Sequence, residues 1–321
     1  MDGIEPKIEI FKPFGEAFEL MKKILFQPFD LGKWCVIGFA AFLAGHFSGS
    51  GFGFSSPRSF GRFHPIRPIN PFPDVSRIEP WLMIVIAVGV VAVLMLIVVL
   101  WWLKARGSFI FTDCIVHNRG AIAQPWHEYR KEGNSYFLFL LVVGFGSLAF
   151  FAIVLLSIFA ALNWGNYSPH GADAVPYAIV LVLLFLLWLA AAIIIGLVSY
   201  FMIPVMYIRR CRSLEAFQEV LRLISRNLGP FVLVALFVAV LIIALVVVST
   251  IVTCATCCLA ALPYVGTVIL LPAFVWLRAF GLLFFRQFGT QYDVWANVIA
   301  PPPLAEATQS PIPPTPPPIQ S

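Results

Sequence analysis

Apolar runs separated by short charged links follow one another along most of the chain. A clear example begins at Ala174 and contains no Asp, Glu, Lys or Arg before Arg209. A helix of about 20 apolar residues is long enough to cross the roughly 30 Å hydrocarbon core of a bilayer. The pattern therefore predicts an all-α integral membrane protein with six transmembrane helices. These spans are expected near residues 34–54, 81–103, 136–162, 177–208, 231–261 and 265–285.

The first and the last two spans depend on finer features of the sequence. The dense apolar part of the first span ends at Phe47, so it is only as long as a buried core helix or a re-entrant segment. Because Gly and Ser extend it to Phe54 without a charge, we expect it to cross. Asn227–Leu277 is uncharged and too long for one helix, so Pro263 is expected to divide it into two spans.

Two shorter segments carry apolar residues on one side and charges on the other. The first is Phe11–Leu25, and the second begins at Ser213, a suitable helix cap. The pattern predicts amphipathic helices in the membrane interface, and a helix packed on protein is the alternative. The expected apolar faces are Phe11, Phe14, Phe18, Met21 and Leu25 in the first helix, and Leu214, Phe217, Leu221 and Ile224 in the second.

The positions of the basic residues predict which side of the membrane each link faces. Lys and Arg gather in the N-terminal segment and in the second and fourth links, whereas the third and fifth links have none. Because positive charge accumulates on the cytoplasmic side, we expect a cell-membrane protein with both termini in the cytoplasm. The first link is an exception, since Arg58, Arg62, Arg67 and Arg77 are dispersed through it.

A weak repeat is visible in this order of elements. Glu16-Ala17-Phe18 precedes a break and a span, as Glu215-Ala216-Phe217 does, and a looser middle copy begins at Ala121. The copies are about a hundred residues apart, a period long enough for a helix followed by a helical hairpin. Three such units are predicted. The alternative is that the segments are unrelated and look alike because they share the same membrane topology.

Composition and charge support the membrane class and exclude others. Hydrophobic residues make up 60% of the chain and charged residues only 12%, whereas soluble domains carry about 25% charge. The net charge of +5 does not predict nucleic-acid binding, because the basic residues form no single patch. Membrane lipids are the expected partner. The candidate lipid-headgroup ligands are Lys104, Arg106, Arg209, Arg210 and Arg212, although the cytoplasmic preference of positive charge also explains them.

Ionisable residues within spans are the usual markers of function in a membrane protein. The second to fifth predicted spans have none, which argues against a carrier coupled to protons or sodium through a buried carboxylate. Arg278 in the sixth span is the exception. The favoured interpretation is a structural charge that extends to the nearby membrane boundary, and a sharper hypothesis pairs it with Asp113 of another unit.

Other residue patterns offer little chemistry. Cys254, Cys257 and Cys258 have a CxxC spacing, but no further ligand lies near them, so packing of small residues is favoured over a metal or redox role. The histidines lack metal-binding spacing, and no nucleophile, P-loop or dinucleotide motif occurs. We therefore expect no metal, no cofactor and no catalytic residues, which means a protein that is not an enzyme.

The end of the sequence differs in composition from the rest. Residues 1–300 are predicted to form the membrane domain, and residues 301–321 a disordered, Pro-rich cytoplasmic tail. Pro311-Ile312-Pro313-Pro314 matches a PxxP ligand, so a protein partner through the tail is an alternative to a plain tail. The oligomeric state stays open.

Several short aromatic motifs point to a resemblance. They are Lys12-Pro13-Phe14, the segment from Pro28 to Trp34, Pro125-Trp126, and the segment from Trp276 to Phe280. The chain resembles bacterial and archaeal six-span membrane proteins of unknown function over roughly residues 8–290. These proteins are loosely similar to the membrane segment attached to some glycerophosphodiester phosphodiesterases. The catalytic barrel of those enzymes is missing, so the resemblance implies a membrane fold and no activity.

Together these features predict a multi-pass membrane protein without catalytic activity. Its favoured function is that of a scaffold or a lipid-interacting membrane component. The alternative is a transporter or pore for a neutral or amphipathic solute, lined by Thr, Ser, Cys and Gly. An intramembrane enzyme ranks last because the spans lack ionisable groups.

Overall fold

The computed structural model describes residues 9, 11–45, 79–164, 174–256 and 262–296, and every regular element within these ranges is helical. Four helices are long and apolar enough to cross a membrane. Three have 35 to 37 residues, so they extend over 50 Å at about 1.5 Å per residue. These helices are α3 (Pro80–Val116), α5 (Arg130–Trp164), α6 (Ala174–Arg209) and α8 (Leu228–Ala255).

The remaining helices are shorter, and six membrane crossings are not confirmed. The first predicted span contains α2 (Leu31–Leu43), whose 13 residues extend only about 20 Å, and residues 46–54 lie outside the described ranges. The last predicted span is divided at Leu270 into two helices, because Pro272 has no N–H to continue the first. The other helices are α1 (Phe11–Leu25), α4 (Ala123–Glu128), α7 (Ser213–Arg226), α9 (Pro263–Ile269) and α10 (Leu271–Arg286).

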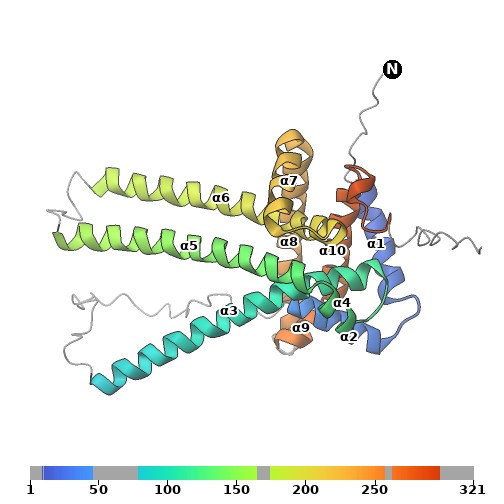
Figure 1. Ribbon diagram of the computed structural model, residues 1–321, viewed down its shortest axis with the longest axis horizontal. Coiled ribbons are helices and arrows are strands. Elements are labelled where there is room, and N and C mark those ends of the chain that lie inside the picture. Colours follow the sequence, from blue (N-terminus) through green and yellow to red (C-terminus); the bar gives the residue numbers. More distant parts are fainter. Residues whose placement is uncertain (1–8, 10, 46–78, 165–173, 257–261, 297–321) are drawn as a thin grey trace, which may run out of the picture.

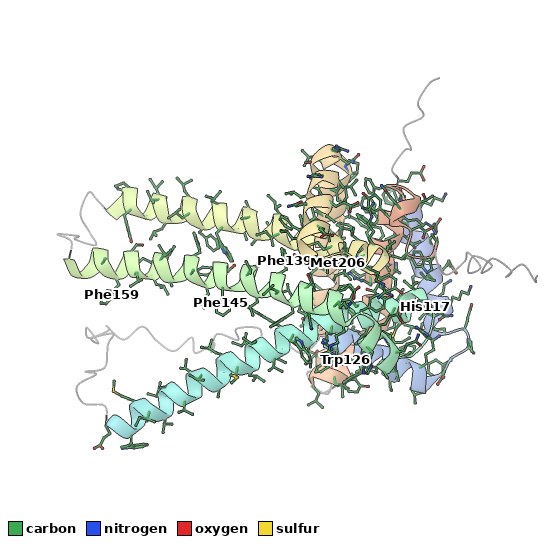
Figure 2. The ribbon with its side chains drawn as sticks, viewed as in Figure 1. His117, Trp126, Phe139, Phe145, Phe159 and Met206 are labelled. Carbon is green, nitrogen blue, oxygen red and sulfur yellow. The ribbon has the colours of Figure 1, made fainter. Side chains whose placement is uncertain are left out.

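The long helices project from a compact group of helices. In Figure 1, α5 and α6 run side by side away from this group, while α3 diverges from them. Their outer parts expose large apolar side chains, and Phe145 and Phe159 project from α5 in Figure 2 with 52% and 48% of their surfaces exposed. Exposed apolar surface of this extent needs a hydrocarbon environment. The surface therefore has the character of a membrane protein.

The hydrophobic core lies at the other end of these helices. It joins α1, α2 and α10 to the inner ends of α3, α5 and α6 and to the start of α8. Aromatic rings dominate it: the Phe201 and Phe231 centroids are 5.3 Å apart, and the Phe231 and Phe284 centroids 5.7 Å. Such edge-to-face pairs add stability to the burial itself. The rigid part of the fold is thus concentrated at one end.

Helix α1 has the predicted bounds and packs on protein. Its buried residues include Ala17, Met21 and Ile24, which face α10. Phe11 and Phe18 from the expected apolar face remain 82% and 46% exposed. One side of the helix therefore packs on protein, as the alternative interpretation predicts. The other side exposes aromatic rings.

Helix α7 begins at Ser213, but Ser213 does not cap it. Its N-cap residue is Arg212, and the Ser213 N–H donates to Ser135 Oγ of α5 at 2.9 Å. The buried face contains Ala216 and Val220, while Leu214 of the expected face is 63% exposed. The buried face shares Ile224 with the expected apolar face and otherwise differs from it, because tertiary contact with α5 and α6, not side-chain size alone, decides which residues are buried.

One packing relation recurs at three places along the chain. Helix α1 packs on α10, α4 on α3, and α7 on α6, so each short amphipathic helix contacts the inner end of a longer one. At each place an Arg after the longer helix or in its last turn bonds a polar side chain of the short helix. The pairs are Arg286–Glu16 at 3.2 Å, Arg119–Gln124 at 2.9 Å and Arg209–Glu219 at 2.6 Å.

Candidate functional site

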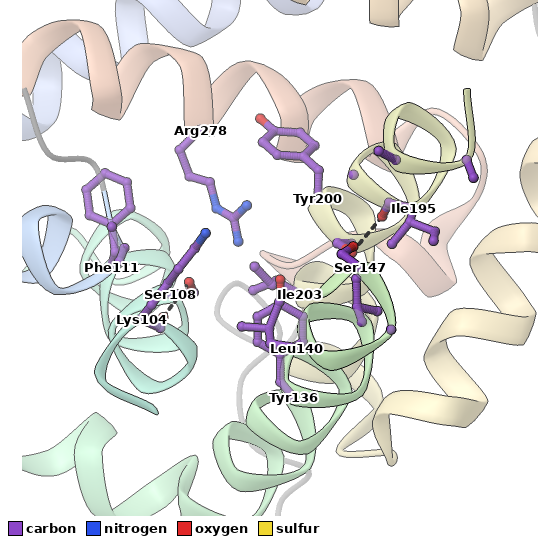
Figure 3. A pocket seen from close by; sticks show the side chains of 18 of the residues that line it. Lys104, Ser108, Phe111, Tyr136, Leu140, Ser147, Ile195, Tyr200, Ile203 and Arg278 are labelled. Carbon is purple, nitrogen blue, oxygen red and sulfur yellow. Dashed lines mark hydrogen bonds between the residues drawn. The ribbon is translucent and has the colours of Figure 1, made fainter. Parts of the chain in front are cut away.

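A cavity of about 650 Å³ lies where α2, α3, α5, α6 and α10 meet (Figure 3). This volume is typical of pockets that hold small molecules. One end is polar and the rest is mostly apolar. The polar end contains Lys104, Ser108, Tyr136, Tyr200 and Arg278, and the apolar wall includes Leu140, Val143, Trp188, Ile195 and Ile203.

Arg278 enters the polar end from α10 and is only 6% exposed. Its Nε and Nη2 both donate to Thr112 Oγ1, at 3.2 and 2.9 Å. Its guanidinium carbon lies 5.4 Å from the centre of the Tyr200 ring. Among the described residues no carboxylate pairs with this guanidinium, so neutral groups alone hold a buried positive charge.

The position of Tyr200 depends on a glycine one turn after Arg278. The Tyr200 hydroxyl donates to the Leu277 carbonyl at 2.9 Å. A Cβ on Gly281 would overlap with the same hydroxyl, so only Gly allows α6 and α10 to approach in this way. The tyrosine ring is thereby fixed beside the guanidinium.

Lys104 of α3 stands at the mouth of the cavity, where its side chain is exposed. Its methylene groups lie against Gly45, whose φ of +86° is in the left-handed region that favours glycine. Figure 3 shows the Lys104 ammonium and the Arg278 guanidinium directed into the same part of the cavity. The polar end of the cavity therefore carries two positively charged side chains.

The apolar wall follows α5 and α6 away from these cations. From Trp188 to Ile203, α6 extends about 22 Å at 1.5 Å per residue. Gly146 and Gly196 line the wall, and a Cβ on either would have no atom within 4 Å. Both glycines are exposed, so the wall is open to the surroundings of α5 and α6. The cavity thus combines a cationic end with an apolar channel of lipid-chain length.

A separate polar cluster surrounds Asp113, which is fully buried. Its carboxylate accepts from the Tyr207 hydroxyl at 3.0 Å and from Arg119 Nη2 at 3.1 Å, and His117 Nδ1 lies 3.0 Å away. The hypothesis that Asp113 pairs with Arg278 is therefore wrong. The cluster is closed by its own members, which is typical of a structural network.

Aromatic rings extend this cluster toward α4. Tyr129 stacks on Tyr207 with centroids 4.8 Å apart, and the Arg210 guanidinium carbon lies 3.9 Å from the centre of the Tyr129 ring. Burial raises the pKa of Tyr129 to about 12. Arg210 also pairs with Glu128. Arg210 is therefore engaged in joining α4 to the end of α6.

The other predicted headgroup ligands also contact protein. Arg106 lies between Trp102 and Trp126, 4.6 and 4.9 Å from their centres. Arg209 binds Glu219, and Arg212 occupies the N-cap position of α7. Of the five basic candidates, Lys104 alone lines the cavity.

The sequence contained a signal for the polar end that was missed. Lys104, Ser108 and Thr112 are spaced by four, which places them on one face of a helix. Two of them line the cavity and the third holds Arg278. Tyr136 and Tyr200 had no comparable signal, because aromatic residues also recur at membrane boundaries.

The cysteine cluster is only partly described. Cys254 is exposed on α8, and Cys257 and Cys258 lie outside the described ranges. Within those ranges no group of three His, Cys, Asp or Glu side chains is placed to hold a metal ion.

The described helices, four of which are long and apolar enough to cross a membrane, are characteristic of the class of helical membrane proteins. Within this class the chain belongs to DUF7544, a family of unknown function whose model matches residues 9–300. No curated protein and no solved structure matches the chain. Nothing in these comparisons links it to the membrane segment of glycerophosphodiester phosphodiesterases, so that part of the resemblance is unsupported. Short aromatic motifs recur at many membrane boundaries, so they do not by themselves specify one family.

Proposed function

We propose that this protein is a non-enzymatic membrane component that holds a lipid in the cavity between α3, α5 and α6. The observation that carries the proposal is the form of the cavity, with cations at one end and an apolar wall along two membrane-length helices. Its described lining offers hydroxyl groups, two cations and apolar side chains. This set suits the binding of an amphipathic molecule, since the polar groups fix its orientation.

The proposed topology places the compact group of helices on the cytoplasmic side. The ends of α3 and α6 with their following arginines lie in this group together with α1. Positive charge favours the cytoplasm, so α1 and the N-terminus are assigned to the same side. Helix α2 ends beside Lys104, which lies in the inner part of α3, whereas α3 itself begins at its outer end. The end of α2 and the start of α3 are therefore assigned to opposite sides, which supports a first crossing.

The recurring helix pairs support three repeated units within this topology. The units are α1–α3, α4–α6 and α7–α10, and each begins with an amphipathic helix. The bond from Arg286 back to Glu16 joins the last unit to the first. This closed arrangement surrounds the polar end of the cavity with protein and leaves the apolar wall facing the lipid.

The transporter alternative and the partner proposal have separate tests. Transport of an amphipathic solute would use the same cavity, so release of the solute from proteoliposomes distinguishes it from lipid holding. A protein partner through residues 301–321 remains a proposal, since this tail lies outside the described ranges.

Filling the cavity tests the lipid-holding function. The full chain is purified in a neutral detergent, and bound lipid is measured by mass spectrometry. Gly196→Phe inserts a ring where no atom lies within 4 Å of the new Cβ, and we expect bound lipid to fall to a small fraction. Gly89→Phe is the matched control, because Gly89 has the same open space on α3 but does not line the cavity. Equal lipid content in both variants would disprove the function.

A further inference from the structure

We infer that the lipid in this cavity is anionic, with a phosphate-bearing head seated between Lys104 and Arg278. The inference rests on the proposed lipid-holding function and adds the chemistry of the head. It starts from the charges at the polar end and then uses the shape of the wall to choose the occupant.

The first argument is the charge of Arg278. A buried guanidinium without a counter-charge is strongly unfavourable, and buried charges in proteins are paired. Among the residues that the structure describes, Arg278 bonds the Thr112 hydroxyl and lies beside the Tyr200 ring, and both groups are neutral. Asp113, which follows Thr112 in the sequence, is bonded to Arg119. The missing negative charge must therefore come from outside the described chain.

The second argument is the position of Lys104. Its ammonium is directed toward the same space as the Arg278 guanidinium (Figure 3). Because Nε and Nη2 of Arg278 already bond Thr112, the part of the guanidinium left for phosphate oxygens is Nη1 with the second Nη2 hydrogen, and a Lys adds a point charge. An anion between the two would compensate both positive charges. The pair is thus suited to a phosphate group.

The third argument selects a lipid over a free anion. A free phosphate would satisfy the cations but leave the apolar wall from Leu140 to Trp188 uncovered. The wall extends about 22 Å along α6, comparable to an acyl chain, and opens beside Gly146 and Gly196. The head and the chain of one phospholipid match the two parts of the cavity.

The test compares two lipids that differ in head charge. The full chain in a neutral detergent is titrated with dioleoylphosphatidylglycerol or dioleoylphosphatidylcholine, and bound lipid is counted by native mass spectrometry. We expect the anionic lipid to bind about tenfold more tightly, because charge-assisted hydrogen bonds to two cations replace contacts with water.

Variants connect this preference to the two cations. Lys104→Gln is expected to reduce the tenfold preference to about twofold or less, since one of the two charge contacts is lost. Lys131→Gln is the control, because Lys131 is an exposed lysine of α5 outside the cavity. Arg278→Gln is expected to remove the preference. If that variant fails to fold, the Lys104→Gln result alone decides.

Each outcome has a separate meaning. Equal binding of the two lipids overturns the anionic head but leaves lipid holding intact, whereas retention of neither lipid overturns the proposed function itself. A preference that survives Lys104→Gln also overturns the inference. A last arm adds excess inorganic phosphate: retention of phosphatidylglycerol supports the lipid as occupant, and its complete displacement assigns the site to free phosphate and overturns the lipid.

Discussion

The buried carboxylate of Asp113 gives the sharpest test of what holds the helices together. Asp113 is fully buried and accepts hydrogen bonds from Tyr207 of α6 and from Arg119 after α3. The substitution Asp113→Asn keeps the size of the side chain and removes its charge. We expect it to destabilise the folded chain because both donors lose an ionised acceptor.

The magnitude follows from the two contacts. The hydrogen bond from Tyr207 to a charged acceptor contributes about 1.5–3 kcal/mol. The ion pair with Arg119 contributes no more than about 1 kcal/mol, because the Arg119 side chain is 35% exposed and is screened by solvent. The sum is about 2–4 kcal/mol, which corresponds to a melting temperature roughly 3–6 °C lower for a chain of this size.

The assay is thermal unfolding of the full chain in a neutral detergent at a fixed heating rate. Glu215→Gln is the control, since Glu215 is an exposed residue of α7 whose charge change should alter stability by less than about 0.5 kcal/mol. Tyr207→Phe with and without Asp113→Asn should show a coupling of about 1 kcal/mol or more. Equal melting temperatures for Asp113→Asn and Glu215→Gln would refute a stabilising role for the cluster.

Three further predictions concern other parts of the fold. Gly144→Val should destabilise the chain by about 1–3 kcal/mol, because its Cβ would overlap with the Trp101 ring; Trp101→Ala should partly restore the melting temperature, and no rescue would contradict the contact. Arg286→Gln should lower the free energy of unfolding by less than about 1 kcal/mol, and the loss should become smaller as salt is added. A double-mutant cycle should show that the loss disappears when Glu16 is also substituted. Burial and the hydrogen bond to Glu219 raise the pKa of Tyr292 to about 12. Its contribution to stability is therefore complete below pH about 10 and lost as pH rises through about 12, and a phenolate absorbance difference against Tyr292→Phe that titrates near 10 would disprove this.

The long helices were predictable because their signal is local. An uncharged apolar run has few alternatives to a helix, so α6 differs from the predicted span 177–208 by only a few residues. The charged helix α1 has the predicted bounds because its apolar residues recur every three or four positions. The failures occur where local signals compete. Helix α2 ends at Leu43, and residues 46–54 of the first predicted span lie outside the described ranges, while Pro272 interrupts the last span although its composition is uniform.

The site was predictable only in part. Lys104 and Arg278 were both singled out as cations near a membrane boundary, but nothing local in the sequence indicates that they meet. Their meeting depends on tertiary contacts, such as the approach of Tyr200 to Gly281. The apolar wall was equally hidden, since a helix face toward a cavity and one toward lipid have the same composition.

The distribution of packing explains why the cavity lies where it does. The core and the polar clusters fix the helices at one end, where Phe201 and Phe284 are fully buried. The outer parts of α3, α5 and α6 have mostly exposed apolar surface, although α5 and α6 contact each other there through Phe151 and Trp188, whose ring centroids are 4.7 Å apart. The cavity begins at the boundary between these two regions. A rigid cationic end joined to a wall open to lipid is an arrangement in which a phospholipid can place its head and its chain at the same time.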